Sequence, residues 1–209
     1  MLYDLRTYTL RPGGVPEFEK RFAEGLHVRE QYSRLGGFWH TEVGTLNQVV
    51  HIWPYDDMAH LERVRGQVAA DDSGLWPPKG GDLILEMESE LLTSTPWMRE
   101  WTEPQELGGY YELRVYTYMP GTIPEVVRRW EKAVPAREKY SPLAGLWTSA
   151  AGVNKLHHLW PYRSLDDRSR LRAESTRNEE FWPPSPPTGE WMLRQENKIL
   201  IPAPFSPMR

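Results

Sequence analysis

The sequence predicts an α+β fold in which two ferredoxin-like β-α-β-β-α-β units form a barrel within one chain. The main observation is an internal duplication, because Tyr3–Thr9 (YDLRTYT) returns as Tyr111–Thr117 (YELRVYT). A second repeated segment, Asn47–Tyr55 (NQVVHIWPY), returns as Asn154–Tyr162 (NKLHHLWPY). Both copies also show the same order of strand and helix patterns. Two copies of one folding unit should present any site as a matched pair.

In the first copy, residues 2–10 alternate and are rich in Tyr, Thr and Leu, which is typical of a strand. Pro16 suits the first turn of a helix. Gly44-Thr45-Leu46 is a tight connection, so the strands on either side of it should form an antiparallel hairpin. The expected elements are strand 2–10, helix 16–33, strands 38–43 and 47–55, a helix from Asp56 or Asp57 that ends by 71, and strand 82–92.

The second copy repeats this order. Its expected elements are strand 110–118, a helix from 124 to about 140, strands 145–151 and 154–162, helix 164–175 and strand 191–200. The domains are therefore placed at 1–95 and 110–209, the second with a Pro-rich tail, and residues 96–109 form the linker. Trp97 and Trp101 indicate that the linker is packed.

A ferredoxin-like sheet has helices on one face, so its other face must be covered or polar. We expect the two copies to turn their bare sheets toward each other. The result would be a closed barrel with a central cavity lined by matched residues from both halves.

Composition excludes several function classes. The net charge of −4 gives no basic surplus for nucleic acid or an anionic membrane, and the absence of Cys excludes disulfides and thiolate chemistry. No apolar run approaches the roughly 20 residues of a membrane span, and we expect no signal or transit peptide, because the first residues have a strand pattern. A cytoplasmic protein is expected, with a small molecule as its partner and a homodimer as a further option.

Two strand faces carry an arginine followed two residues later by a tyrosine: Arg6 and Tyr8, then Arg114 and Tyr116. A mid-strand arginine is costly to bury without a partner. It can form a structural ion pair with Asp4, Glu112 or another carboxylate, among which Glu88 and Glu196 are favoured, or it can anchor an anionic ligand.

Each hairpin carries a histidine and a tryptophan on one face, and another tryptophan in the preceding strand: His51, Trp53 and Trp39, then His158, Trp160 and Trp147. Such a histidine can act as a general acid or base, ligate haem, or only hydrogen-bond inside the barrel. His40, Glu42 and His51 would share one face if residue 40 lay opposite residue 51, but a metal is not the expected cofactor.

The Trp-Pro-Pro loops at Trp76 and Trp182 precede the last strand of each copy. They can cover the cavity or serve as packing anchors.

The segments Asp4–Leu10 with Pro12-Gly13, and Gly44–Trp53, resemble the NIPSNAP family signature, and Asn154–Trp160 is a drifted second copy. The resemblance implies a dimeric α+β barrel fold. That group includes cofactor-free monooxygenases, haem-degrading enzymes, isomerases and dehydratases. The fold therefore does not supply the reaction.

The sequence thus predicts a protein that binds, and in its enzyme version transforms, a small aromatic or hydrophobic molecule in the barrel cavity. The chemistry would be cofactor-independent acid–base catalysis of isomerase, lyase or monooxygenase type. His51 or His158 would move a proton, Tyr8 or Tyr116 would donate to an oxygen, the arginines would hold an anionic group, and the tryptophans would form an apolar box. The alternatives are a haem-binding protein with His51 or His158 as axial ligand, and a non-catalytic interaction module.

Overall fold

The computed structural model describes residues 1–177 and 190–209 of the 209-residue chain. The first half contains β1 (Leu2–Leu10), α1 (Val15–Arg29), β2 (Gly37–Val43), β3 (Gln48–Tyr55), α2 (Met58–Ala69) and β4 (Ile84–Ser94). The second half contains β5 (Tyr110–Tyr118), α3 (Ile123–Arg137), β6 (Gly145–Ser149), β7 (Lys155–Tyr162), α4 (Leu165–Thr176) and β8 (Met192–Pro202). The predicted β-α-β-β-α-β order is confirmed in both halves.

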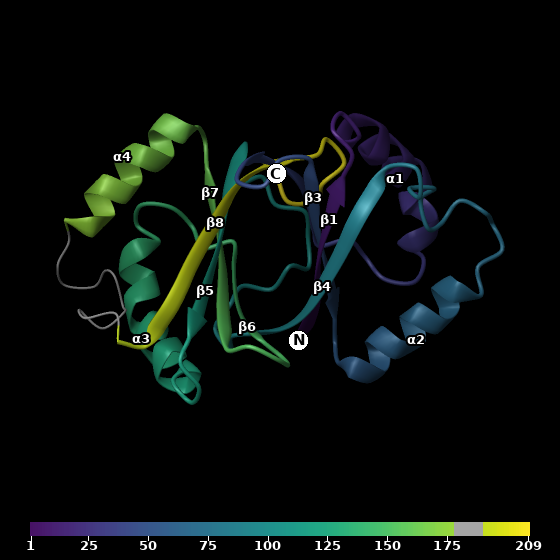
Figure 1. Cartoon of the computed structure of the whole chain (residues 1–209). Coiled ribbons are helices and arrows are strands. Elements are labelled where there is room, and N and C mark those ends of the chain that lie inside the picture. The colour runs from purple at the N-terminus through teal and green to yellow at the C-terminus, as the bar shows by residue number, and fades with distance from the viewer. Residues whose placement is uncertain (178–189) are drawn as a thin grey trace.

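All eight strands form one closed barrel in the order β1-β3-β2-β8-β5-β7-β6-β4. Antiparallel pairing of β2 with β8 and of β4 with β6 joins the two halves. Helices α1 and α2 flank one side of the barrel, and α3 and α4 flank the other (Figure 1). The predicted intrachain barrel is therefore confirmed.

One end of the barrel interior is filled by apolar side chains from both halves. The cluster includes Tyr3, Leu5, Trp39, Ile52, Leu92, Trp101, Tyr111, Leu113, Trp147, Leu159 and Leu200. Trp39 and Trp147 are both 0% exposed, and Tyr3 packs edge-on against Trp147 with ring centroids 5.6 Å apart. This end is a hydrophobic core, and burial of its large aromatic rings holds the two halves together.

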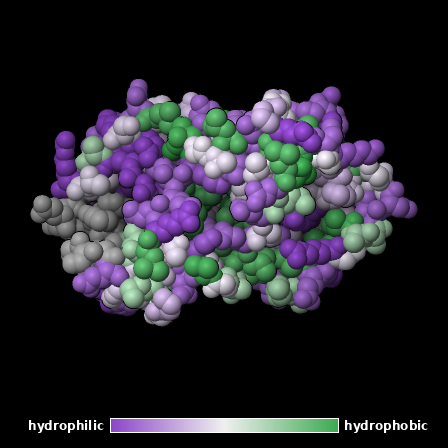
Figure 2. Space-filling model, in the orientation of Figure 1, coloured by the Kyte–Doolittle hydropathy of each residue, from purple (hydrophilic) through white to green (hydrophobic). Residues whose placement is uncertain are grey.

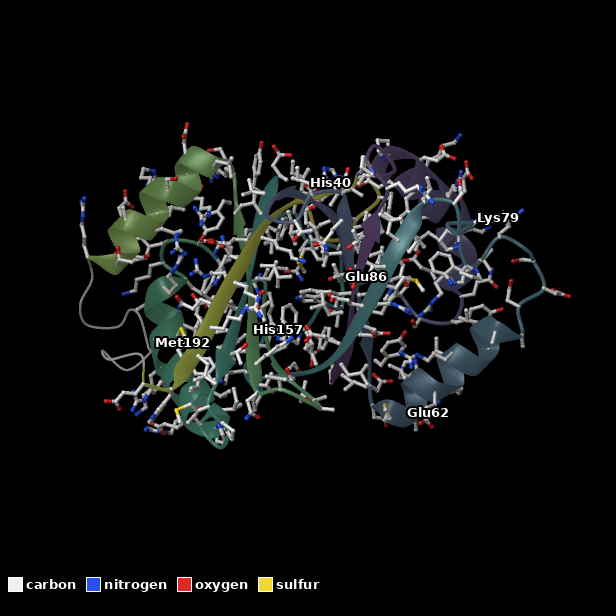
Figure 3. All side chains as sticks on the ribbon, in the orientation of Figure 1. His40, Glu62, Lys79, Glu86, His157 and Met192 are labelled. Carbon is white, nitrogen blue, oxygen red and sulfur yellow. The ribbon has the colours of Figure 1, made fainter. Side chains whose placement is uncertain are left out.

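The other end of the barrel is polar, and its contacts also cross between the halves. Glu90 of β4 accepts from His157 of β7 (Nε2 to Oε2, 3.0 Å) and from Lys155. Lys198 of β8 donates to Gln48 of β3 (Nζ to Oε1, 2.6 Å). In Figure 3, His157 lies beside the space between the two halves.

The linker and the C-terminal tail each pack on the other half. At the start of the linker, the backbone N–H of the preceding residue, Thr95, donates to the Leu146 carbonyl at 3.2 Å. In the tail, the Ala203 N–H donates to the Phe38 carbonyl at 3.1 Å. The Trp101 indole donates to the Ala144 carbonyl at 2.7 Å, so the linker is packed as predicted. The domain boundaries themselves stay a prediction.

No helix among the described residues is long and apolar enough to cross a membrane. A cytoplasmic location and a homodimer stay predictions.

Trp39 and Trp147 each lie over a glycine two residues earlier in the same strand. A Cβ on Gly37 would lie 2.0 Å from Cη2 of Trp39, and a Cβ on Gly145 would lie 2.0 Å from Cη2 of Trp147. We expect Gly37→Ala and Gly145→Ala to displace the indoles and to lower the free energy of unfolding by about 1–3 kcal/mol each. Urea denaturation measures the effect.

Gly66 is the matched control, because a Cβ there meets no atom within 4 Å and the residue lies inside α2. Gly66→Ala should raise stability by roughly 0.5–1 kcal/mol. Equal effects at Gly37 and Gly66 would contradict the packing argument.

Candidate functional site

The predicted arginine, tyrosine, histidine and tryptophan do come together in each half. Arg6 of β1 lies opposite His51 of β3, and Arg114 of β5 lies opposite His158 of β7. They lie on the outer surface of the barrel, beneath the helices: Phe22 of α1 contacts the His51 ring with centroids 5.3 Å apart. The expectation that these groups line a cavity between the two sheets is therefore wrong.

Trp39 and Trp147 are not part of this group, which corrects the predicted apolar box. The hairpin pairs Phe38 with His51 and Leu146 with His158, so the neighbouring tryptophans face into the barrel. Side chains alternate between the two surfaces of a strand, so adjacent residues lie in different places, one inside the barrel and one beneath the helices.

Glu88 and Glu196 are not the partners of Arg6 and Arg114, again because of strand register. Glu88 lies opposite Thr7 and Glu196 opposite Val115, both on the barrel-facing surface. The residues of β4 and β8 that lie opposite the arginines are Ser89 and Asn197.

The alternative metal trio is not assembled. His40 lies opposite Val49 rather than His51, and its Nδ1 lies 2.8 Å from Oε1 of Glu19. Glu42 is exposed. Within residues 1–177 and 190–209, no group of three or more potential ligating side chains is close enough to hold a metal ion.

The first half contains a pocket of about 790 Å³ between the strands and the helices. Its lining combines polar residues with aromatic and apolar ones: Asp4, Arg6, Tyr8, Arg29, His51, Tyr55 and Arg65, with Phe18, Phe22, Trp53, Val68, Trp76, Pro77, Ile84, Leu85 and Met87. This size and mixture are typical of small-molecule sites. The Trp76 loop lines the pocket, whereas Trp182 lies outside the described residues.

The protonation state of His51 follows from its neighbour Trp53. The Trp53 indole can only donate, and its Nε1 donates to His51 Nδ1 at 2.7 Å. His51 Nδ1 is therefore an acceptor, and the ring proton must lie on Nε2. Burial, assisted by the charges of Arg6 and Arg29, holds the His51 pKa well below its usual value, so the ring is neutral.

Neutral His51 is thus a hydrogen-bond donor at Nε2. That nitrogen is buried and has no partner among the described residues. A histidine that ligates haem needs a free lone pair on the ligating nitrogen, and here Nε2 carries the proton. The site does not fit the haem alternative.

Two further donors line the same pocket. The Nε of Arg6 is buried and has no partner within the described part of the chain. Burial raises the pKa of Tyr8, so its hydroxyl keeps its proton, and its ring stands edge-on to His51 at 4.9 Å.

The pocket also holds a buried cation that the sequence analysis missed. Arg29 is 6% exposed, donates to the Tyr55 hydroxyl at 2.9 Å and to Ser33, and lies 4.1 Å above the Trp53 ring. Among the described residues it has no ion pair, and burial lowers its pKa. Its recurrence as Arg137 at the repeat offset was a signal in the sequence.

Asp4 is the carboxylate on this surface. It accepts from Ser89 Oγ at 2.5 Å and pairs with Arg65 at 3.1 Å, while Arg6 is farther away, at 3.9 Å. The strongest partners of Asp4 are therefore Ser89 and Arg65. Arg6 is farther away, so its guanidinium can bind another group.

In the second half, the corresponding arginine is already engaged. Arg114 Nε donates to the Tyr116 hydroxyl at 2.7 Å, and Nη1 pairs with Glu112 at 3.0 Å. Glu112 also binds Arg168 at 2.6 Å and Arg172 at 3.4 Å. Glutamate is one methylene longer than Asp4, and Arg168 stands where the first copy has Leu61.

His158 shares the tautomer of His51, because Trp160 Nε1 donates to its Nδ1 at 2.6 Å. Trp130 stands where the first half has Phe22, and its ring lies 4.6 Å from His158. The two halves keep the same histidine and tryptophan pair but surround it differently.

The comparisons with known proteins agree with the fold. Protein NipSnap homolog 3A of Homo sapiens is 32% identical over 217 residues, which cover 100% of this chain and 86% of that protein. A solved "uncharacterized NIPSNAP domain protein" from Burkholderia xenovorans is 38% identical and covers 48% of this chain and 100% of that chain, with a TM-score of 0.46. A "putative monooxygenase" from Lactobacillus acidophilus is 9% identical over 96% of this chain and 93% of that one, with a TM-score of 0.70.

The last likeness shows the fold alone, since one fold hosts many functions. The family model described as NIPSNAP matches residues 3–99 and again residues 111–207, once in each half. The chain therefore belongs to the NIPSNAP family and carries two copies of its domain.

Proposed function

We propose that the first-half pocket binds a small organic molecule that combines an oxyanion with an apolar or aromatic body. The observation that carries this proposal is a pair of buried donors beside one cavity, Arg6 Nε and His51 Nε2, which have no acceptor among the described residues. Tyr8 lines the same cavity, and its protonated hydroxyl is a third donor there. A buried donor without a partner is costly, and an oxygen of the ligand would satisfy it.

The charges around the pocket support an anionic ligand. Arg6 and Arg29 both line it, and the carboxylate on the same strand surface, Asp4, is held by Ser89 and Arg65. Glu86 also borders the pocket, but it shares the barrel-facing surface of β4 with Glu88 and Glu90. An arginine fork and neutral donors suit a carboxylate or an enolate better than an amine or an alcohol.

The apolar wall supports a flat or hydrophobic body. Phe22, Trp53 and Trp76 surround one region of the pocket, with ring centroids 5.0 Å apart for Phe22 and Trp76 and 6.0 Å apart for Trp53 and Trp76. Aromatic walls of this kind bind apolar groups by burying their surface and by edge contacts.

The same geometry defines the chemistry that the pocket can support without a cofactor. His51 and Tyr8 are proton donors, so their role is to polarise a carbonyl or to stabilise an enolate, as a neutral imidazole does in an oxyanion site. This is the electrophilic half of acid–base isomerase or lyase chemistry. Of the general-acid and general-base roles expected for His51, the proposed function uses only that of a donor.

Substitutions of His51 separate its two contacts. In His51→Asn, the amide can still accept from the Trp53 indole but has no group at the Nε2 position. In His51→Gln, a donor is kept near that position and the Trp53 acceptor is lost. We expect His51→Asn to weaken binding of benzoate or cinnamate at least tenfold, since a charged-group hydrogen bond is lost, and His51→Gln to weaken it less.

Isothermal titration calorimetry at pH 7 measures these affinities, with His158→Asn as the matched control in the second half. The proposal fails at this residue if His51→Asn binds the aromatic carboxylates as tightly as the unmodified protein.

The arginines give a second comparison between the halves. Arg6→Gln removes a guanidinium that is held only by a long ion pair to Asp4, so the affinity for benzoate should fall by about tenfold or more. Arg114→Gln removes a guanidinium that Glu112 and Tyr116 already bind, so benzoate affinity should stay within about twofold while thermal stability falls. Titration of both variants side by side decides the matter, and an equal loss of affinity in both would refute the assignment to the first half.

The buried histidines also predict a pH dependence of stability. Burial keeps the pKa values of His51 and His158 well below 6.5 in the folded chain, whereas the unfolded chain takes up their protons near pH 6.5. The unfolded state therefore binds more protons below that pH. Stability should fall as the pH drops below 6.5, by up to about 1.4 kcal/mol per pH unit for each histidine.

Urea unfolding at pH 7.5, 6.5 and 5.5, about one pH unit on either side of the usual histidine pKa, measures how steeply stability depends on pH. The double variant His51→Asn/His158→Asn should flatten it. His27 is exposed, so His27→Asn should leave it unchanged. An unaltered slope in the double variant would show that other groups take up the protons.

A further inference from the structure

The helix-facing surface of β4 changes from polar to apolar along its length. Ser89 lies opposite Arg6 and donates to Asp4, and Met87 lies opposite Tyr8. A bulge at Leu85 follows, where the pairing moves from Thr9 with Glu86 to Leu10 with Ile84, and both Leu85 and Ile84 line the pocket. At about 3.3 Å per residue, the distance from Ser89 to Leu85 is roughly 13 Å. The pocket thus has a polar end near Arg6 and an apolar end toward the start of β4.

The apolar end is open to solvent. Leu85 is 58% exposed and Met87 is 59% exposed, yet both line the pocket that contains Arg6 and His51. Strand β6 pairs with β4 only at residues 92–94, so among the described residues this part of β4 has no paired strand on that side. Hydrophobic surface covers the upper part of β4 in Figure 2.

The second half lacks this pair of side chains. Leu193 corresponds to Leu85 and is 64% exposed, but Gln195 lies opposite Tyr116 where Met87 lies opposite Tyr8. The two exposed apolar side chains therefore occur together in the half where Arg6 Nε has no partner among the described residues. Two large apolar groups kept beside a pocket mouth indicate a surface that a ligand covers.

We infer that the ligand is a straight-chain carboxylate amphiphile, whose head group binds Arg6 and His51 and whose apolar chain leaves the pocket over Met87 and Leu85. This inference rests on the proposed function and adds the shape of the ligand to it. Pocket residues Phe18 and Ile84 would surround the inner part of the chain, and the two exposed side chains its outer part.

The test is a chain-length series, because each methylene buried on apolar surface should raise affinity by a constant factor. Hexanoate, octanoate, decanoate and dodecanoate are titrated below their micelle concentrations, with benzoate as the probe of the head-group contacts alone. In the unmodified protein, affinity should rise about two- to fourfold for each methylene until the chain passes Leu85.

The double variant Leu85→Gln/Met87→Gln gives each position a polar side chain, as the second half has at Gln195. It should flatten the dependence on chain length for the longer acids while leaving benzoate affinity unchanged. Leu193→Gln is the matched control on the second half and should leave the full dependence in place. Sedimentation of every variant shows whether the substitutions alter association between copies of the chain.

Each outcome has a distinct meaning. If benzoate binds through Arg6 but affinity does not rise with chain length, the amphiphile inference is overturned and the proposed function stands. If the rise persists in the double variant, the chain does not pass over Leu85 and Met87, and the inference fails. If the variant alters only the association state, this surface is a contact between copies. If neither benzoate nor any fatty acid binds, the proposed function falls as well.

Discussion

The alternation of side chains in a closed barrel is the constraint on which the rest of this structure depends. Every strand has one surface inside the barrel and one facing out of it, and the pairing of β2 with β8 and of β4 with β6 closes the barrel at the two junctions between the halves. Trp39 and Trp147 fill the interior because their positions along the strands face inward. His51 and His158 lie under the helices because their positions face outward. The hydrophobic core and the candidate site are opposite faces of the same strands.

The duplication then sets a scaffold that the two halves use differently. The tryptophan that donates to histidine Nδ1 is kept in both halves, so both rings are neutral donors at Nε2. Small changes around them decide which donors stay available. Glu112 in place of Asp4, with Arg168 in place of Leu61, engages Arg114, whereas Arg6 lies beside a pocket and its Nε has no partner in the described part of the chain. A carboxylate one methylene longer and an added arginine together make the guanidinium of Arg114 part of an ion network.

Much of the fold was readable because it is encoded locally. Period-two and helical patterns, the Pro and Gly positions and the offset of the repeats gave the element order and the barrel. The pairs Arg6 with Tyr8, and His51 with Trp53, were correctly placed on shared strand faces. The prediction of the site was wrong where it needed contacts between strands. Glu88 was assigned to Arg6 and Trp39 to His51, and in each case the true neighbour is the adjacent residue, which faces the other way.

By itself, the sequence determined that this protein is two copies of one α+β unit, that each copy carries an arginine, a tyrosine, a histidine and a tryptophan at fixed spacing, and that cysteine chemistry is absent. Only the tertiary structure decided which surface of the sheet those groups occupy, which nitrogen of His51 carries the proton, and that Arg29 joins the pocket from α1. The reason is physical: local propensity fixes the elements, whereas register, tautomer and burial depend on partners far away in the chain.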